Sequence, residues 1–72
     1  MTVYEKIVET GKNFNHNTYV IYTLNGDTGR IVDHTSSLSE ARSYAKIGKK
    51  NGLSVYVAEY NPNTNEVCFD IH

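Results

Sequence analysis

A turn sequence that occurs twice in this chain constrains its fold more than any other feature of the sequence. Residues 22–32 (YTLNGDTGRIV) and residues 58–68 (AEYNPNTNEVC) each contain an asparagine followed three residues later by a threonine. The two asparagines, Asn25 and Asn61, lie 36 positions apart in a chain of 72 residues. The spacing raises the hypothesis of a duplicated unit. The alternative is that two hairpins arrived independently at the same turn residues.

Both repeats have the composition of β-hairpin loops. Gly29 and Asn65 end the loops, and glycine and asparagine tolerate positive φ most easily. In the second loop Pro62 presets φ for a type I turn, and the Asn61 side chain can accept a hydrogen bond from the backbone two residues ahead. The flanking segments are rich in β-branched and aromatic residues, which predicts four strands at residues 18–24, 30–34, 53–60 and 66–72.

The segment between the two hairpins is predicted to be a helix over residues 38–51. Ser37 and Glu40 match a capping box at its start, and Gly52 stands where a left-handed stop is expected. At about 100° per residue, one side of this helix collects mainly small apolar residues. We expect that side to pack closely on the sheet through Leu38, Ala41, Tyr44, Ala45, Ile47 and Gly48.

The N-terminal segment, residues 3–10, carries two competing patterns. Thr2 and Glu5 repeat the capping box and Gly11 is a candidate stop, which favours a short helix. Alternation of apolar and charged residues in the same segment also fits an edge strand. With a helix the chain is an (αββ)2 pseudo-repeat, and with a strand it is βββαββ.

These elements predict a single domain, residues 1–72, of the α+β class. Its small antiparallel sheet has about four strands in two hairpins and is covered on one face by helix. A domain of this size buries only a little over half of its unfolded surface, so its core is thin. Association with a protein partner, or as a homodimer, is therefore favoured.

Composition and charge exclude several classes of function. Seven lysines and arginines against eight aspartates and glutamates give a net charge of −1, which provides no overall attraction to nucleic acid or to an anionic membrane. The single cysteine, Cys68, cannot form an internal disulfide, and the N-terminus lacks the pattern of a signal peptide. We expect a soluble cytoplasmic protein with no membrane segment.

No metal ligand, cofactor site or catalytic residue is predicted. Cys68, Asp70 and His72 alternate along the last predicted strand, but side chains two residues apart are separated by about 7 Å, too far for one ion to bind all three. The NGDTG loop lacks the lysine, the glycine spacing and the following helix of a phosphate-binding loop. We therefore expect a protein that is not an enzyme.

Two candidate partner-binding surfaces follow from the sequence pattern. If the valines of the third predicted strand face the helix, its tyrosines point to an uncovered face, where aromatic side chains suit protein contacts. The tyrosines of this candidate surface are Tyr56, Tyr60 and Tyr22. On the helix, basic side chains occupy one arc of about 100°. The residues of this basic arc are Arg42, Lys46, Lys49 and Lys50.

The favoured function is a small non-enzymatic protein-binding module that acts by covering a surface of its partner. The many asparagine, threonine and tyrosine residues resemble the composition of small phage accessory proteins. This suggests an inhibitor of a host system, such as an anti-defence (anti-CRISPR-like) protein, in the cytoplasm of a bacterial or phage-infected cell. The alternative is a small nucleic-acid-binding protein that uses the basic arc.

Overall fold

The computed structural model describes residues 2–25 and 28–69 of the chain. Its elements are α1 (Val3–Gly11), β1 (Thr18–Asn25), β2 (Thr28–Thr35), α2 (Leu38–Lys50), β3 (Val55–Asn61) and β4 (Glu66–Cys68). Each lies within a few residues of its predicted place. The last strand ends at Cys68, so Phe69 lies beyond it although the prediction included it, and residues 70–72 of the predicted range lie outside the described residues.

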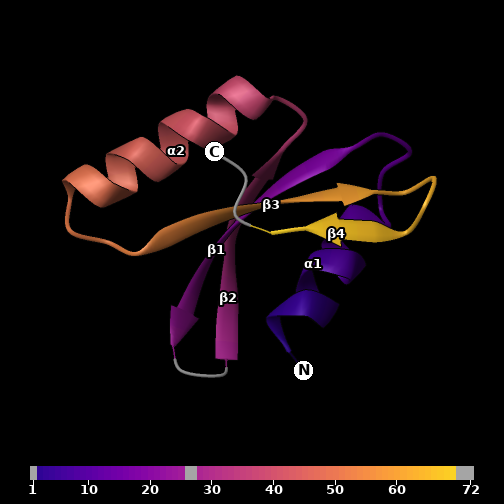
Figure 1. The fold of residues 1–72 in the computed structure, drawn as a ribbon, viewed down its shortest axis with the longest axis horizontal. Helices are drawn as coiled ribbons and strands as arrows, with labels where there is room; N and C mark the ends of the chain where they lie inside the picture. Colours follow the sequence, from indigo (N-terminus) through magenta and orange to yellow (C-terminus); the bar gives the residue numbers. More distant parts are fainter. Residues whose placement is uncertain (1, 26–27, 70–72) are drawn as a thin grey trace.

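The strands form one antiparallel sheet in the order β2–β1–β3–β4, which Figure 1 shows as a strongly twisted pair of hairpins. β1 pairs with β2, and β3 pairs with β4. The central strands β1 and β3 join the hairpins, with Val20 opposite Ala58 and Tyr22 opposite Tyr56. The predicted α+β class and the two antiparallel hairpins are confirmed.

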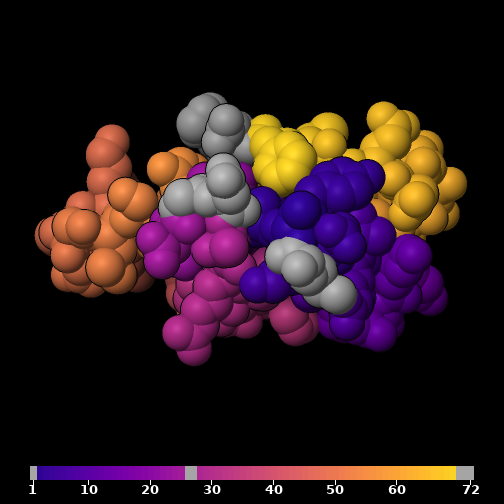
Figure 2. Space-filling view, turned by 90° about the horizontal axis from the view of Figure 1, so that it is seen from below, coloured from indigo at the N-terminus to yellow at the C-terminus, as the bar shows by residue number. Residues whose placement is uncertain are grey.

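Helices cover both faces of this sheet. On one face Tyr60 of β3 is buried in a cluster with Ile7 of α1. On the other face Ile21 and Val57 are buried in a cluster with Ala41 of α2. The sequence predicted helical cover on one face, and α1 adds cover on the second. In Figure 2, α1 (indigo) lies over that second face beside β4 (yellow).

α1 begins at a complete capping box. The Glu5 backbone N–H donates to Thr2 Oγ1 over 3.2 Å, and the Thr2 backbone N–H donates to the Glu5 carboxylate over 3.2 Å. The hydrogen bond from the Thr2 backbone, followed by that from its hydroxyl, lowers the pKa of Glu5 below its ordinary value. The helical interpretation of the N-terminal segment is confirmed, and the strand alternative is wrong.

The order of elements repeats as αββαββ, but the two halves are not copies of each other in space. A rotation that exchanges the antiparallel neighbours β1 and β3 within the sheet would keep both helices on one face. α1 and α2 instead pack on opposite faces, and Figure 1 shows them on either side of the crossing strands. The repeated turn therefore does not by itself establish a duplication.

α2 starts where predicted, with a modified cap. Ser37 Oγ accepts from the Glu40 backbone N–H over 3.3 Å, as in a capping box. The Glu40 carboxylate, however, accepts from the Thr35 hydroxyl over 2.6 Å, and the Ser37 N–H donates to that same hydroxyl over 3.1 Å. The predicted capping box is therefore half formed, because the preceding strand supplies a competing side chain. Gly52, at φ 78°, ends the helix as predicted.

The repeated turns need their closing residues for different reasons. Asn65 has φ 59°, and Asn61 Oδ1 accepts from the Asn63 N–H over 2.9 Å, as predicted for the second loop. Gly29 does not have a positive φ, so that expectation is wrong. A β-carbon at Gly29 would lie 2.4 Å from the Val3 side chain. Glycine is required there because α1 approaches the strand closely.

A β-bulge in β2 redirects the side chains of this outer strand. The register with β1 shifts between Ile21, which is opposite Asp33, and Tyr22, which is opposite Ile31, and Val32 is the extra residue. Tyr22 and Ile31 belong to the cluster under α1, whereas Ile21 belongs to the cluster under α2. The bulge therefore places Val32 and Asp33 together on the α2 side of the strand.

Gly11 of α1 lies directly against the ring of Tyr60. A β-carbon at Gly11 would lie 2.1 Å from Tyr60 Cδ1, far inside contact distance. The ring has little room to retreat, because Tyr60 is buried and its hydroxyl donates to the Asn65 side chain. The helix ends at Gly11 as predicted, but Gly11 has no positive φ and Lys12 caps the helix in a right-handed conformation. Glycine is needed at position 11 for packing.

We predict that Gly11→Ala lowers the stability of the fold. Alanine favours helix over glycine by about 1 kcal/mol, whereas overpacking a core contact costs about 1 to 3 kcal/mol. Because an approach of 2.1 Å to a buried ring lies at the severe end of that range, we expect a net loss of about 2 kcal/mol. Urea denaturation measures it. Glu9→Ala is the control, because this exposed position in the same helix adds no clash. Unchanged or higher stability in Gly11→Ala would contradict the packing of α1 on Tyr60.

Candidate binding surface

The three predicted tyrosines do not form an uncovered face. Tyr22 and Tyr60 are buried because α1 lies over that face of the sheet, and only Tyr56 is exposed. Tyr56 also stacks on Tyr22 at a centroid distance of 5.6 Å, which covers one side of its ring. The expectation of an exposed tyrosine surface is therefore wrong for Tyr22 and Tyr60. The spacing of Val3 and Ile7 was the sequence signal for this burial, because it gives the N-terminal helix an apolar side that must pack on the sheet.

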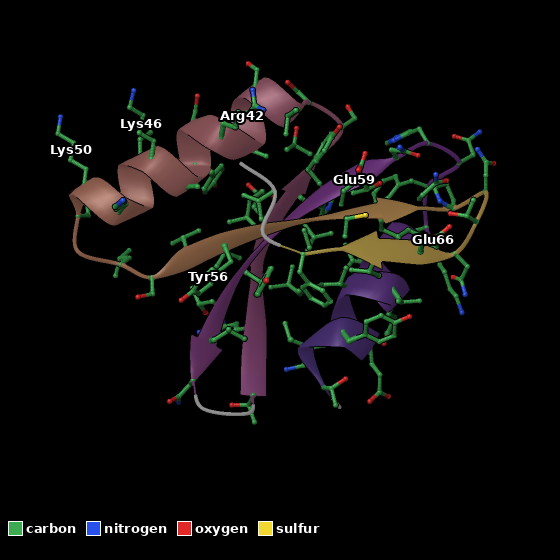
Figure 3. The ribbon with its side chains drawn as sticks, viewed as in Figure 1. Arg42, Lys46, Lys50, Tyr56, Glu59 and Glu66 are labelled. Atoms are coloured by element: carbon green, nitrogen blue, oxygen red, sulfur yellow. The ribbon has the colours of Figure 1, made fainter. Side chains whose placement is uncertain are left out.

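The predicted basic arc lies along the solvent side of α2. Lys46 and Lys50 point away from the sheet in Figure 3, and Arg42 and Lys49 are exposed as well. Lys46 and Lys49 border a hollow of about 440 Å³ that Tyr56 also lines. The structure thus brings three predicted residues to one hollow. Arg42 and Lys50 are not among its lining residues.

Four exposed apolar side chains lie together between α2 and the outer strand β2. Ile47 is 60% exposed, Leu53 is 59%, Val32 is 48% and Tyr44 is 43% exposed. All four line one hollow of about 170 Å³, and we call these four residues the α2–β2 surface. Contiguous exposed apolar side chains mark sites of contact with other molecules. This surface is the candidate binding site.

The α2–β2 surface exists because α2 packs on the centre of the sheet. Ala41 and Gly48 are buried there, and a β-carbon at Gly48 would lie 2.6 Å from the Val55 side chain. α2 packs mainly on β3 and β1, so its flank with Tyr44 and Ile47 faces outward above β2. The sequence prediction that Tyr44 and Ile47 pack on the sheet is therefore wrong.

The surface continues into a more polar hollow at the N-terminal end of α2. This hollow has a volume of about 500 Å³, and Tyr44 and Ile47 form part of its wall. Asp33 of β2 and Glu40 of α2 also line it. Carboxylates therefore border the apolar side chains at this end, whereas Lys50 lies at the opposite end of the helix.

Hydrogen bonds orient the side chains at the polar end. The Tyr44 hydroxyl donates to Asp33 Oδ2 over 2.8 Å, and Asp33 Oδ1 accepts from the His34 backbone N–H over 2.8 Å. The bond from His34, followed by that from Tyr44, lowers the pKa of Asp33 below its ordinary value. The same carboxylate raises the pKa of Tyr44. Tyr44 is thus held in place as a neutral hydrogen-bond donor.

Groups for metal or covalent chemistry are sparse in the part of the chain that the structure describes. Within residues 2–25 and 28–69, no group of three or more His, Cys, Asp or Glu side chains is placed to hold a metal ion. Cys68 is free and exposed, while Asp70 and His72 lie outside the described residues. Across these same ranges, none of the helices has the length and apolar character needed to cross a bilayer.

Comparisons of this chain with protein-family models, curated proteins and solved structures find no match.

We predict that Tyr44→Phe raises the pKa of Asp33 toward its ordinary value, because the carboxylate loses one of the two donors that stabilise its charged form. A lowered folded-state pKa contributes stability above the unfolded pKa, and this stability is lost as pH falls through the folded pKa. In the variant this contribution to stability should therefore be smaller, and its loss should be complete at a higher pH. Carboxyl NMR shifts measured across the acid range report the pKa.

Tyr4→Phe is the matched control for this titration. Tyr4 is an exposed tyrosine on α1, which packs on the opposite face of the sheet from α2. Its removal should leave the Asp33 titration unchanged. An Asp33 pKa that is the same in Tyr44→Phe and in the unmodified protein would show that the hydrogen bond is not maintained in solution.

Proposed function

We propose that this protein is a small protein-binding module without enzymatic activity, and that it binds through the α2–β2 surface. The observation that supports the proposal is the group of four apolar side chains, each left about half exposed. Complete burial of an apolar side chain of this size stabilises a complex by about 1.5 to 3 kcal/mol, and roughly half of that is still available at each position. A protein partner that covers the four residues gains this stabilisation.

The size of the chain is compatible with such a contact. A specific interface covers about 800 Å² on each partner, or about one sixth of the 4884 Å² of surface that this chain exposes. The four apolar residues form the centre of the proposed interface. Asp33, Glu40 and Lys50 lie around them and supply the polar rim that protein interfaces have.

Nucleic-acid binding is the alternative function, and the exposed basic arc of α2 supports it. Apart from Lys50, which borders the apolar flank, the arc lies along a different side of the helix from Tyr44 and Ile47. Asp33 and Glu40 border that flank and would repel a polyanion there. Protein binding is preferred because it uses the exposed apolar side chains, which phosphate contacts would leave in water.

This proposal includes the inhibitory role that the sequence suggested. A module that binds by surface contact inhibits a host system when it covers a site that the host protein needs. The proposed compartment is the cytoplasm of a bacterial or phage-infected cell. The support for this finer role is the composition of the chain, which is rich in asparagine, threonine and tyrosine.

We predict that a photo-crosslinking amino acid placed at position 47 captures protein. The full chain carrying benzoylphenylalanine in place of Ile47 would be expressed in bacterial cells, irradiated and analysed by gel electrophoresis and mass spectrometry. Leu24 is the matched control position, because it is a similarly exposed apolar residue outside the α2–β2 surface. Adducts with protein should be several times more abundant at position 47 than at position 24.

Each other outcome of this experiment has a defined meaning. Adducts of equal abundance at both positions would contradict the assignment of the surface. Adducts with nucleic acid, or binding to nucleic acid that weakens steeply with salt and is lost in Lys46→Glu, would favour the alternative function. The peptides recovered from protein adducts show whether the captured chain is this protein itself or a different one.

A further inference from the structure

We propose that the chain covering the α2–β2 surface is a second copy of this protein, bound through two α2 helices that run antiparallel. The inference rests on the proposed function and identifies the partner. A second copy is favoured because the outward flank of α2 is complementary to itself, both in the order of its charges and in the position of its apolar side chains.

The outward flank of α2 carries a stripe with an acid at one end and a base at the other. Glu40, Tyr44, Ile47 and Lys50 follow one another at intervals of four, three and three residues, the spacing that places side chains along one side of a helix. All four are exposed. The acid lies in the first turn of α2 and the base in its last turn. We call these four residues the α2 stripe.

Antiparallel pairing brings the complementary ends of two stripes together. With a two-fold axis midway along the stripe, Glu40 of each copy lies opposite Lys50 of the other. Tyr44 and Ile47 of the two copies meet at the centre, and the dipoles of the two helices are opposed, which is favourable. Such a contact uses the same patch on both copies and closes on itself, so it gives a dimer and not a filament.

The other charges of α2 are compatible with this arrangement. At about 100° per residue, Lys49 lies on the side of the helix opposite Glu40, and Lys46 lies about 100° around the helix from Ile47. Parallel pairing would instead place Glu40 against Glu40 and Lys50 against Lys50, which is repulsive. Ser43 lies beside the stripe, and its small side chain lets two helices approach closely.

Pairing of two β2 edges is the competing self-contact, and the bulge disfavours it. β2 is an outer strand of the sheet. Its register shift at Val32 interrupts the regular hydrogen-bond pattern that an added strand needs. The same bulge turns Val32 toward the α2 side, where it lines the hollow shared with Tyr44 and Ile47. The edge strand thus adds apolar area to a contact made by the helices.

The length of α2 indicates a weak, reversible dimer. Its 13 residues span about 20 Å, so the contact lies at the small end of specific interfaces. A dissociation constant between about 1 μM and 1 mM is expected for association of this kind. Measurements therefore have to cover this whole range of concentration.

Analytical ultracentrifugation of the full chain from about 5 μM to about 1 mM tests the proposal. We expect an equilibrium between monomer and dimer. Ile47→Asp should raise the dissociation constant at least about a hundredfold, because it removes an apolar contact from both copies and places two carboxylates at the centre. Leu24→Asp, at an exposed apolar position elsewhere, should leave it unchanged. Circular dichroism shows whether each variant retains its helices.

A charge swap tests the predicted pair across the interface. Glu40→Lys and Lys50→Glu should each raise the dissociation constant about tenfold, because two attractive pairs become two repulsive pairs. The double variant should restore association. Lys49→Glu makes the same change of charge outside the stripe and should have little effect. Lys50→Glu leaves the cap of α2 untouched, so its comparison with Lys49→Glu is decisive even if Glu40→Lys weakens the helix.

Two results would overturn the inference. One is a protein that stays monomeric at about 1 mM. The other is a dimer that neither Ile47→Asp nor the charge swap affects. If the protein is monomeric and the crosslinker at position 47 captures a different protein, the proposed dimer is wrong but the proposed function is supported. If the protein is monomeric and gives no protein adducts at position 47, both the proposed dimer and the proposed function are wrong.

Discussion

The central strands β1 and β3 carry apolar side chains on both faces, and the rest of the structure depends on covering both faces with two short helices. α1 covers the face that holds Tyr60, and α2 covers the face that holds Ile21. Each helix approaches the sheet through a glycine, Gly11 against Tyr60 and Gly48 against Val55. These close contacts allow a thin core to form, because they bring the backbone of each helix near the strands.

The α2–β2 surface is exposed because of the way in which α2 packs on the sheet. Small residues turned toward the sheet let the helix come close, but they bury little apolar area themselves. The larger side chains of Tyr44 and Ile47 are left on the flank above β2, and the bulge adds Val32 beside them. In a domain of this size no further element is present among the described residues to cover that flank.

Charge divides the exposed part of α2 into two surfaces of different composition. The α2 stripe combines apolar residues with one acid and one base, whereas the basic arc carries only positive charges. Lys50 belongs to both the stripe and the arc. A dimer formed through the stripe would leave Lys46, Lys49 and the nearby Tyr56 accessible on each copy.

Local sequence predicted most of the secondary structure, because its signals act over a few residues, but it left the N-terminal segment open between helix and strand. The Thr2–Glu5 capping box, the positive φ at Gly52 and the Asn61–Asn65 turn all depend on residues that lie close together in the sequence. The order of charges along the α2 stripe was equally readable. The exposure of side chains was not, because it depends on contacts between segments far apart in the chain.

The tyrosine face and the apolar side of α2 show this limit most directly. Tyr60 is buried because α1, from the other end of the chain, packs on it through Gly11. Ile47 is exposed because α2 is centred on β1 and β3 and not on β2. Both outcomes follow from which elements share the limited area of the sheet. Periodicity within one helix or strand identifies its apolar side chains, but only the packed structure determines which of them find a partner within the chain.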